Sequence, residues 1–167
     1  MSTQTNEEGA VVDPSSEGGS TLFTGGCACG AIRYECSSEP ILTFNCHCLN
    51  CQKASGSAFA SCLMVPSADL KLAQGEPKYY TVTADNGYPI SRGFCPECGS
   101  PVLVELPYKP RIAIIQAASL DDPSWHRPAA DIYTKRAHPW DYMNPELPKF
   151  PELPPLPDSP LFEILQP

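Results

Sequence analysis

Residues 27–52 read CACGAIRYECSSEPILTFNCHCLNCQ and hold six cysteines and one histidine. So many thiols can serve as disulfide crosslinks, metal ligands or a reactive nucleophile. The whole chain has nine cysteines, an odd number that internal pairing cannot satisfy. The first twenty residues, MSTQTNEEGAVVDPSSEGGS, lack the basic start and apolar core of a signal peptide. We therefore expect a cytoplasmic, reducing location, in which stable disulfides are uncommon and metal coordination or catalysis is favoured.

Composition limits the classes of partner. The chain has 167 residues, of which 42% are hydrophobic, as expected for one globular domain. Its 19 acidic residues outnumber its 11 basic ones, giving a net charge of -8, and no basic cluster interrupts that balance. Binding to nucleic acid or to an anionic membrane surface is therefore disfavoured. No apolar run is long enough to span a bilayer.

The chain divides into three parts by composition. Residues 1–20 are predicted to form a disordered acidic tail and residues 21–143 the ordered domain. Residues 144–167 contain eight prolines and are predicted to form an extended proline-rich tail.

The ordered part predicts a mostly β fold. Short runs that alternate or are rich in β-branched and aromatic residues, such as AIRYEC, KYYTV and SPVLVEL, are separated by turn residues. SAFASCLMVP predicts a buried strand ended by Pro66, which cannot donate to a sheet ladder. Only residues 48–56, CLNCQKASG, predict a helical turn, with Gly56 as its stop signal.

Two of the three short-spaced cysteine groups suggest a structural metal site. Cys95 and Cys98, followed by Gly99, form a turn of the zinc-knuckle type. Such a pair supplies half of a tetrahedral site, and Cys27 and Cys29 can complete it. A site with four thiolates has no open position and is structural.

The middle group, Cys46, Cys48 and Cys51, has three thiols and no obvious fourth ligand. Zinc held by three thiolates has a formal charge of -1 and is a poor Lewis acid for making hydroxide. It is better suited to a soft external ligand, and a thiol held there loses its proton and becomes nucleophilic. The pattern therefore favours thiol chemistry.

Other interpretations of the cysteines stay open at this point. All seven grouped cysteines can be structural if Cys36, Cys62 or His47 closes the second site. An iron–sulfur cluster is conceivable, although the spacing matches none of the common patterns. Because His47 alternates with its cysteine neighbours, its side chain is predicted to point away from the metal.

The chain contains three motifs in this order: GGCACGAIRY, NCHCLNCQKASGSAF and RGFCPECGSPV. In order and spacing they resemble the glutathione-dependent formaldehyde-activating enzyme family, to which the centromere protein V group also belongs. The resemblance runs from about Gly25 to Leu103. It implies a β-tent fold of small antiparallel sheets, shared with Rab-exchange-factor-like zinc proteins. It also implies two zinc ions per chain, one structural and one catalytic, on these residues: Cys27, Cys29, Cys95 and Cys98, and Cys46, Cys48 and Cys51.

The resemblance further implies a carbon–sulfur lyase activity in which glutathione adds to formaldehyde to give S-hydroxymethylglutathione. Beside the ligands, Lys53, Gly56 and Ser57 are candidates for binding the substrate. Ser57 can hydrogen-bond a peptide-like molecule or cap a turn, and Lys53 can pair with a carboxylate or stay solvated. Two other functions remain: a lyase or isomerase acting on another metabolite at the same metal, and a non-catalytic zinc module that binds a protein.

Overall fold

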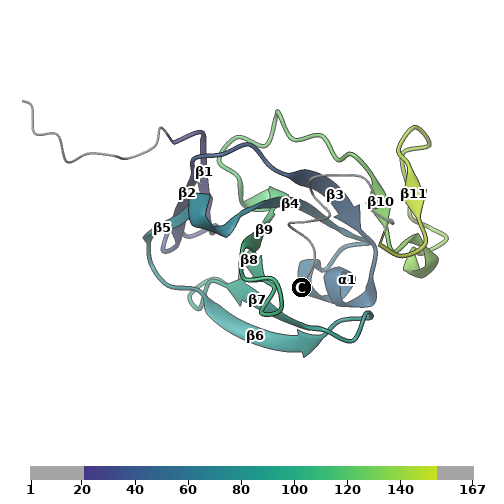
Figure 1. Cartoon of the computed structure of the whole chain (residues 1–167), viewed down its shortest axis with the longest axis horizontal. Helices are drawn as coiled ribbons and strands as arrows, with labels where there is room; N and C mark the ends of the chain where they lie inside the picture. Colours follow the sequence, from purple (N-terminus) through teal and green to yellow (C-terminus); the bar gives the residue numbers. More distant parts are fainter. Residues whose placement is uncertain (1–20, 154–167) are drawn as a thin grey trace, which may run out of the picture.

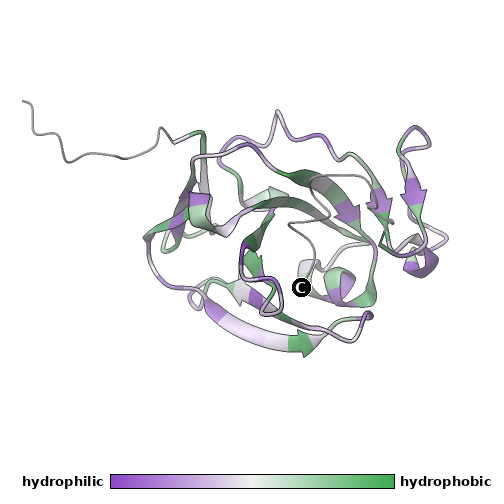
Figure 2. Cartoon of the chain, in the orientation of Figure 1, coloured by the Kyte–Doolittle hydropathy of each residue, from purple (hydrophilic) through white to green (hydrophobic). Residues whose placement is uncertain are grey.

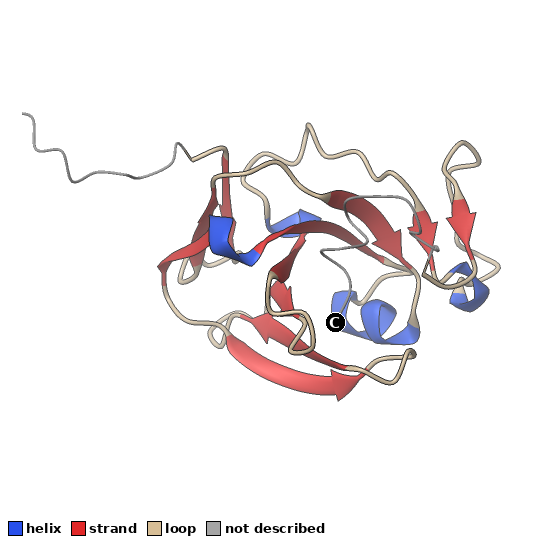
Figure 3. Ribbon diagram, in the orientation of Figure 1, coloured by secondary structure: helices blue, strands red, loops and turns tan. Residues whose placement is uncertain are grey.

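The computed structural model describes residues 21–153, and it is mostly β, as predicted. Its strands form a three-stranded sheet, β1-β2-β5, and an eight-stranded sheet, β11-β10-β3-β4-β9-β8-β7-β6 (Figures 1 and 3). The strands of the small sheet are β1 (Phe23–Gly26), β2 (Arg33–Cys36) and β5 (Leu70–Gln74). Those of the large sheet are β3 (Leu42–Cys46), β4 (Ala60–Pro66), β6 (Lys78–Thr83), β7 (Pro89–Phe94), β8 (Pro101–Glu105), β9 (Ile112–Gln116), β10 (Asp131–Ile132) and β11 (Lys149–Phe150).

Helical structure in the described residues is short. The α-helix α1 (Leu49–Ser55) occupies the segment predicted to be a helical turn, and Gly56 caps it in the left-handed conformation. Three single turns of 3-10 helix, η1 (Ser67–Asp69), η2 (Ala117–Ser119) and η3 (Thr134–Arg136), complete the elements. None of these helices is long and apolar enough to cross a membrane.

One face of the large sheet makes the main core. Leu63 and Val65 on β4 and Ile115 on β9 pack with Tyr34 of β2 and Phe23 of β1, all at most 9% exposed. Successive side chains of a strand point to opposite faces, so Cys62 and Met64 of the same strand face the other way. The strand β4 is thus apolar on both faces, which explains its nearly continuous hydrophobic sequence (Figure 2).

The large sheet is mixed. The strand β10 runs parallel to both β3 and β11, and the remaining pairs in the sheet are antiparallel. The resemblance implied small antiparallel sheets, and this parallel edge enlarges one of them. The strand β11 comes from residues 144–153, the start of the predicted proline-rich tail. Residues 1–20 and 154–167, which carry the rest of the two predicted tails, lie outside the described residues.

Candidate metal centres

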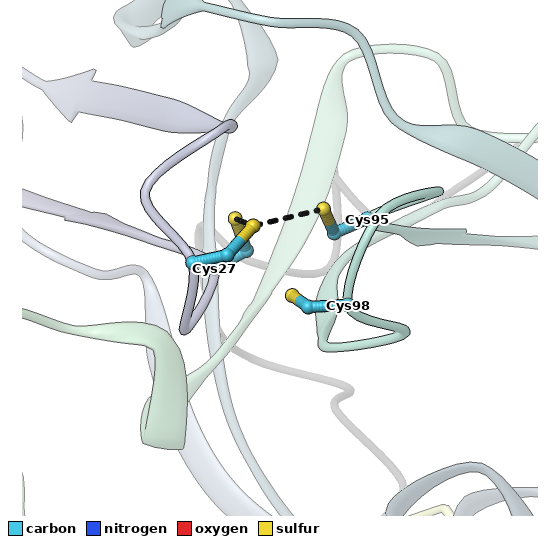
Figure 4. Close-up of side chains that lie close together, drawn as sticks. Cys27, Cys95 and Cys98 are labelled. Carbon is cyan, nitrogen blue, oxygen red and sulfur yellow. Dashed lines mark hydrogen bonds between the residues drawn. The ribbon is translucent and has the colours of Figure 1, made fainter.

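The first cysteine cluster lies where two strand-to-strand turns meet. Cys27 and Cys29 sit in the β1–β2 turn of the small sheet, and Cys95 and Cys98 sit in the β7–β8 turn of the large sheet. Each turn closes on a glycine with positive φ: Gly30 (78°) and Gly99 (74°). Figure 4 shows the thiols of Cys27, Cys95 and Cys98 turned toward one another across the gap.

The geometry of this cluster fits a tetrahedral metal. The four Sγ atoms lie within 4.8 Å of one another, with Cys27 3.5 Å from Cys29 and Cys29 3.7 Å from Cys95. Four thiolates at zinc–sulfur distances of about 2.3 Å would be about 3.8 Å apart. The cluster therefore can hold a metal ion, and an ion here would join the small sheet to the large one.

Hydrogen-bond donors surround this cluster. The amide of Ile32 donates to the Sγ of Cys27 at 3.2 Å, and the Ser100 hydroxyl lies 3.2 Å from the Sγ of Cys98. The side chain and backbone of Ser100 lower the pKa of Cys98 to about 5. A thiol ionised at neutral pH is the form that binds metal.

The second cluster, Cys46, Cys48 and Cys51, lies at the junction between β3 and α1. Cys46 is the last residue of β3, Cys48 is the N-cap of α1, and Cys51 lies in its first turn. The Cys48 Sγ accepts a hydrogen bond from the backbone amide of Cys51 at 3.4 Å, which holds the Cys48 side chain over the first turn of α1. All three Sγ atoms lie within 4.8 Å of one another, and all three residues are at most 9% exposed.

Charge explains why three buried thiols at this distance favour a cation. Hydrogen bonds from Cys46 and Cys51 lower the pKa of Cys48 strongly. Hydrogen bonds with Cys48 and Cys51, together with burial, raise the pKa of Cys46 well above its usual range. Without a cation the cluster thus favours a single thiolate. A metal ion supplies the positive charge that allows all three cysteines to be thiolates. Arg92 on β7 adds positive charge and donates to the Cys51 Sγ at 3.6 Å.

No fourth protein ligand joins the second cluster among the residues that the structure describes. His47 points away, as predicted: its Nε2 is 3.3 Å from Asp131 Oδ1 and its Nδ1 is 3.1 Å from Asp141 Oδ2. Cys36 lies in the main core on the other side of the large sheet. Cys62 is near the cluster but outside the group of mutually close sulfur atoms.

A cavity of about 380 Å³ begins at this second cluster. It lies against the second face of the large sheet, on which Phe44, Met64, Ile90, Val104 and Ile114 all point into it. Arg92, Asp85, Asn86, Lys109 and Gln116 are the charged or amide side chains among its twenty-one lining residues. The three thiols are therefore part of the lining of a largely apolar cavity.

The three residues predicted to bind substrate lie elsewhere. Lys53 is exposed on α1, Gly56 is the cap at its C-terminus, and Ser57 is exposed in the turn that follows. None of them lines the cavity. Their predicted role would require a substrate that extends beyond the cavity, and it stays a prediction.

Sequence reasoning did not identify the cavity wall. Its residues come from strands that are distant in sequence, and only the strand register brings them together. The signal that was present is the nearly continuous apolar run in β4, which is unusual for an antiparallel strand with one face in water.

Two comparisons with known proteins bear on this chain. The family model described as "Glutathione-dependent formaldehyde-activating enzyme" matches residues 22–136, which include both cysteine clusters. A crystal structure of a Rhodobacter sphaeroides protein, solved as a structural genomics target, superposes with a TM-score of 0.48 at 19% sequence identity. That similarity covers 75% of this chain and 98% of the other.

Proposed function

The chain belongs to the glutathione-dependent formaldehyde-activating enzyme family, and we propose that it is a zinc-dependent enzyme of the carbon–sulfur lyase type. It joins a thiol, glutathione in the simplest case, to formaldehyde or a related small electrophile. The observation that carries the proposal is a set of three buried thiols in the lining of a cavity, with no fourth ligand among the described residues.

The two cysteine clusters have different roles in this proposal. Cys27, Cys29, Cys95 and Cys98 hold a structural zinc ion that joins the two sheets. Cys46, Cys48 and Cys51 hold the catalytic ion and leave one position for a ligand from outside. When bound, this zinc supplies a soft acceptor for the thiol sulfur and favours loss of the thiol proton.

The chain's own residues then orient the reactants. The guanidinium of Arg92, beside Cys51, offsets part of the negative charge that gathers where thiolates meet. The apolar wall of the cavity limits water around the sulfur, and confinement brings the small aldehyde close to it. A sulfur lone pair forms the new bond to the aldehyde carbon, the carbon–oxygen π bond breaks, and the proton lost from the thiol ends on the hydroxyl oxygen.

Exchange NMR tests this proposal. The rate at which formaldehyde and glutathione exchange with their adduct should rise when zinc-loaded protein is added, above the spontaneous rate. The matched control is Cys48→Ser, which removes one ligand from the catalytic cluster only. We expect it to bind one zinc ion fewer per chain and to return exchange to the spontaneous rate while the fold is kept.

Two results would contradict the proposal. If wild-type protein with two bound zinc ions gives only the spontaneous rate for all thiols tested, the protein is not this type of enzyme. If Cys48→Ser keeps both ions, Cys48 is not a ligand.

A further inference from the structure

The register of the strands places apolar side chains side by side in the cavity wall. Leu42 on β3 pairs with Met64 on β4, Met64 pairs with Ile114 on β9, and Ile114 pairs with Val104 on β8. Directly paired residues of antiparallel strands point to the same face, so these four side chains form one row across the sheet. All four line the cavity.

The charged groups at the cavity are few, and most have partners. Arg92 donates to Cys51, and Asp85 lies 3.6 Å from the guanidinium of Arg136. Lys109 lies 5.8 Å from the centre of the Tyr108 ring. Glutathione carries two carboxylates and one ammonium group at neutral pH. Among the described lining residues, its two carboxylates meet two positive charges, Lys109 and a guanidinium already shared with a thiol, besides the amides of Asn86 and Gln116.

Burial energetics favour a different occupant. Apolar surface gains about 25 cal/mol per Å² when it is removed from water, whereas a carboxylate placed there without a partner is strongly disfavoured. Cavities of this size that bind small molecules are usually apolar with a few polar groups that set orientation. Here the thiol cluster and five charged or amide side chains are polar, and the rest of the lining is mostly apolar.

We propose that the thiol used by this protein carries an apolar body, aromatic or branched aliphatic, which packs against Leu42, Met64, Ile114 and Val104 with its sulfur at the second cysteine cluster. This inference rests on the proposed function, because it assumes that a thiol binds at that cluster. It replaces the tripeptide by a hydrophobic thiol as the preferred substrate.

The test is a binding series on full-length protein loaded with cobalt(II), whose absorption bands report a sulfur ligand at the metal. The probes are ethanethiol, butanethiol, phenylmethanethiol and glutathione. Each methylene buried contributes about 0.8 kcal/mol, or about fourfold in affinity. Butanethiol should therefore bind about fifteenfold more tightly than ethanethiol, and phenylmethanethiol more tightly than glutathione.

Two leucine variants give a matched comparison. Leu42→Gln places an amide in the cavity wall, whereas Leu72→Gln changes a leucine that is 39% exposed on β5, in the other sheet. The first should weaken phenylmethanethiol binding at least about threefold, and the second should leave it unchanged. Ile114→Thr, in the same row of side chains but on β9, repeats the test should Leu42→Gln fail to fold.

The outcomes separate this inference from the proposed function. Tighter binding of the apolar thiols, weakened by the Leu42 or Ile114 variant, supports it. If glutathione perturbs the cobalt bands and binds as tightly as phenylmethanethiol or more tightly, the inference is wrong and the proposed function stands. If no thiol perturbs the bands of protein with both sites loaded, both are wrong.

Discussion

Loss of the two exposed ligands should reveal how much the four-thiol cluster stabilises the fold. Cys29 and Cys98 are both exposed, so the double variant Cys29→Ser/Cys98→Ser opens no cavity in the core and leaves one thiol on each turn, too few to hold the ion. A metal held by Cys29 and Cys95 links positions 66 residues apart and restricts the unfolded chain as a crosslink does. The loop-entropy relation for such a crosslink gives about 4 kcal/mol. That is a large part of the roughly 5–15 kcal/mol that a domain usually has.

Urea denaturation of the zinc-loaded protein measures this difference. With a slope of about 2 kcal/mol per molar urea, the double variant should unfold at a midpoint about 2 M lower than wild type. A strong chelator is the control, because without metal the two proteins should have the same midpoint. Coincident midpoints in the zinc-loaded state would refute the crosslinking argument. A difference that persists in chelator would show that the serines act through something other than the metal.

Three further perturbations test the surroundings of the second cluster and the sheet. Asp131→Ala removes the carboxylate 3.3 Å from the Nε2 of His47 and should lower the unfolding free energy by about 1–3 kcal/mol, measured by urea denaturation; an unchanged midpoint would contradict this. Arg92→Met removes the donor to Cys51 and should weaken thiol binding about tenfold without changing the metal content. Titration of the cobalt-loaded protein with thiol measures this affinity, and an unaltered affinity would exclude the proposed role of Arg92. Burial, and then the charge of Arg127, lower the pKa of His126 below 6.5, so the unfolded chain takes up a proton first as pH falls. The stability contributed by neutral His126 is therefore complete above pH 6.5 and is lost as the pH falls from 6.5 toward the pKa of the folded protein. Urea midpoints measured across this pH range should fall less for His126→Gln than for wild type. An equal pH dependence of the two proteins would count against this.

Local sequence was sufficient for the parts of the site held by local geometry. Cys46, Cys48 and Cys51 lie within six residues, so the end of one strand and the first turn of one helix bring them together. The pairing of the β1–β2 turn with the β7–β8 turn is long-range, yet four cysteines in two turn-like pairs suggested it. The mostly β class followed from alternation and from the lack of a helical period, and it is confirmed.

Contacts that depend on strand register could not be predicted from the sequence. Arg92 reaches Cys51 over a separation of 41 residues, and Asp131 reaches His47 over 84. Nothing local to either residue indicates its partner. The candidates for substrate contact were chosen because they follow the ligands in sequence, but the direction of α1 leaves Lys53 exposed and outside the cavity lining.

The two clusters differ in a way that a purely structural role for both does not explain. The four-thiol cluster includes two exposed cysteines and joins two sheets, which is what a stabilising ion requires. The three-thiol cluster joins only β3 to the helix that directly follows it, a connection that needs little crosslinking because the loop is so short. Burying three thiolates together is electrostatically unfavourable unless a cation is present, and a cation with three thiolates still lacks one ligand. A missing ligand beside a cavity does not help a structural ion, whereas the proposed function requires it, and under that proposal the molecule that completes the cluster offsets its energetic disadvantage.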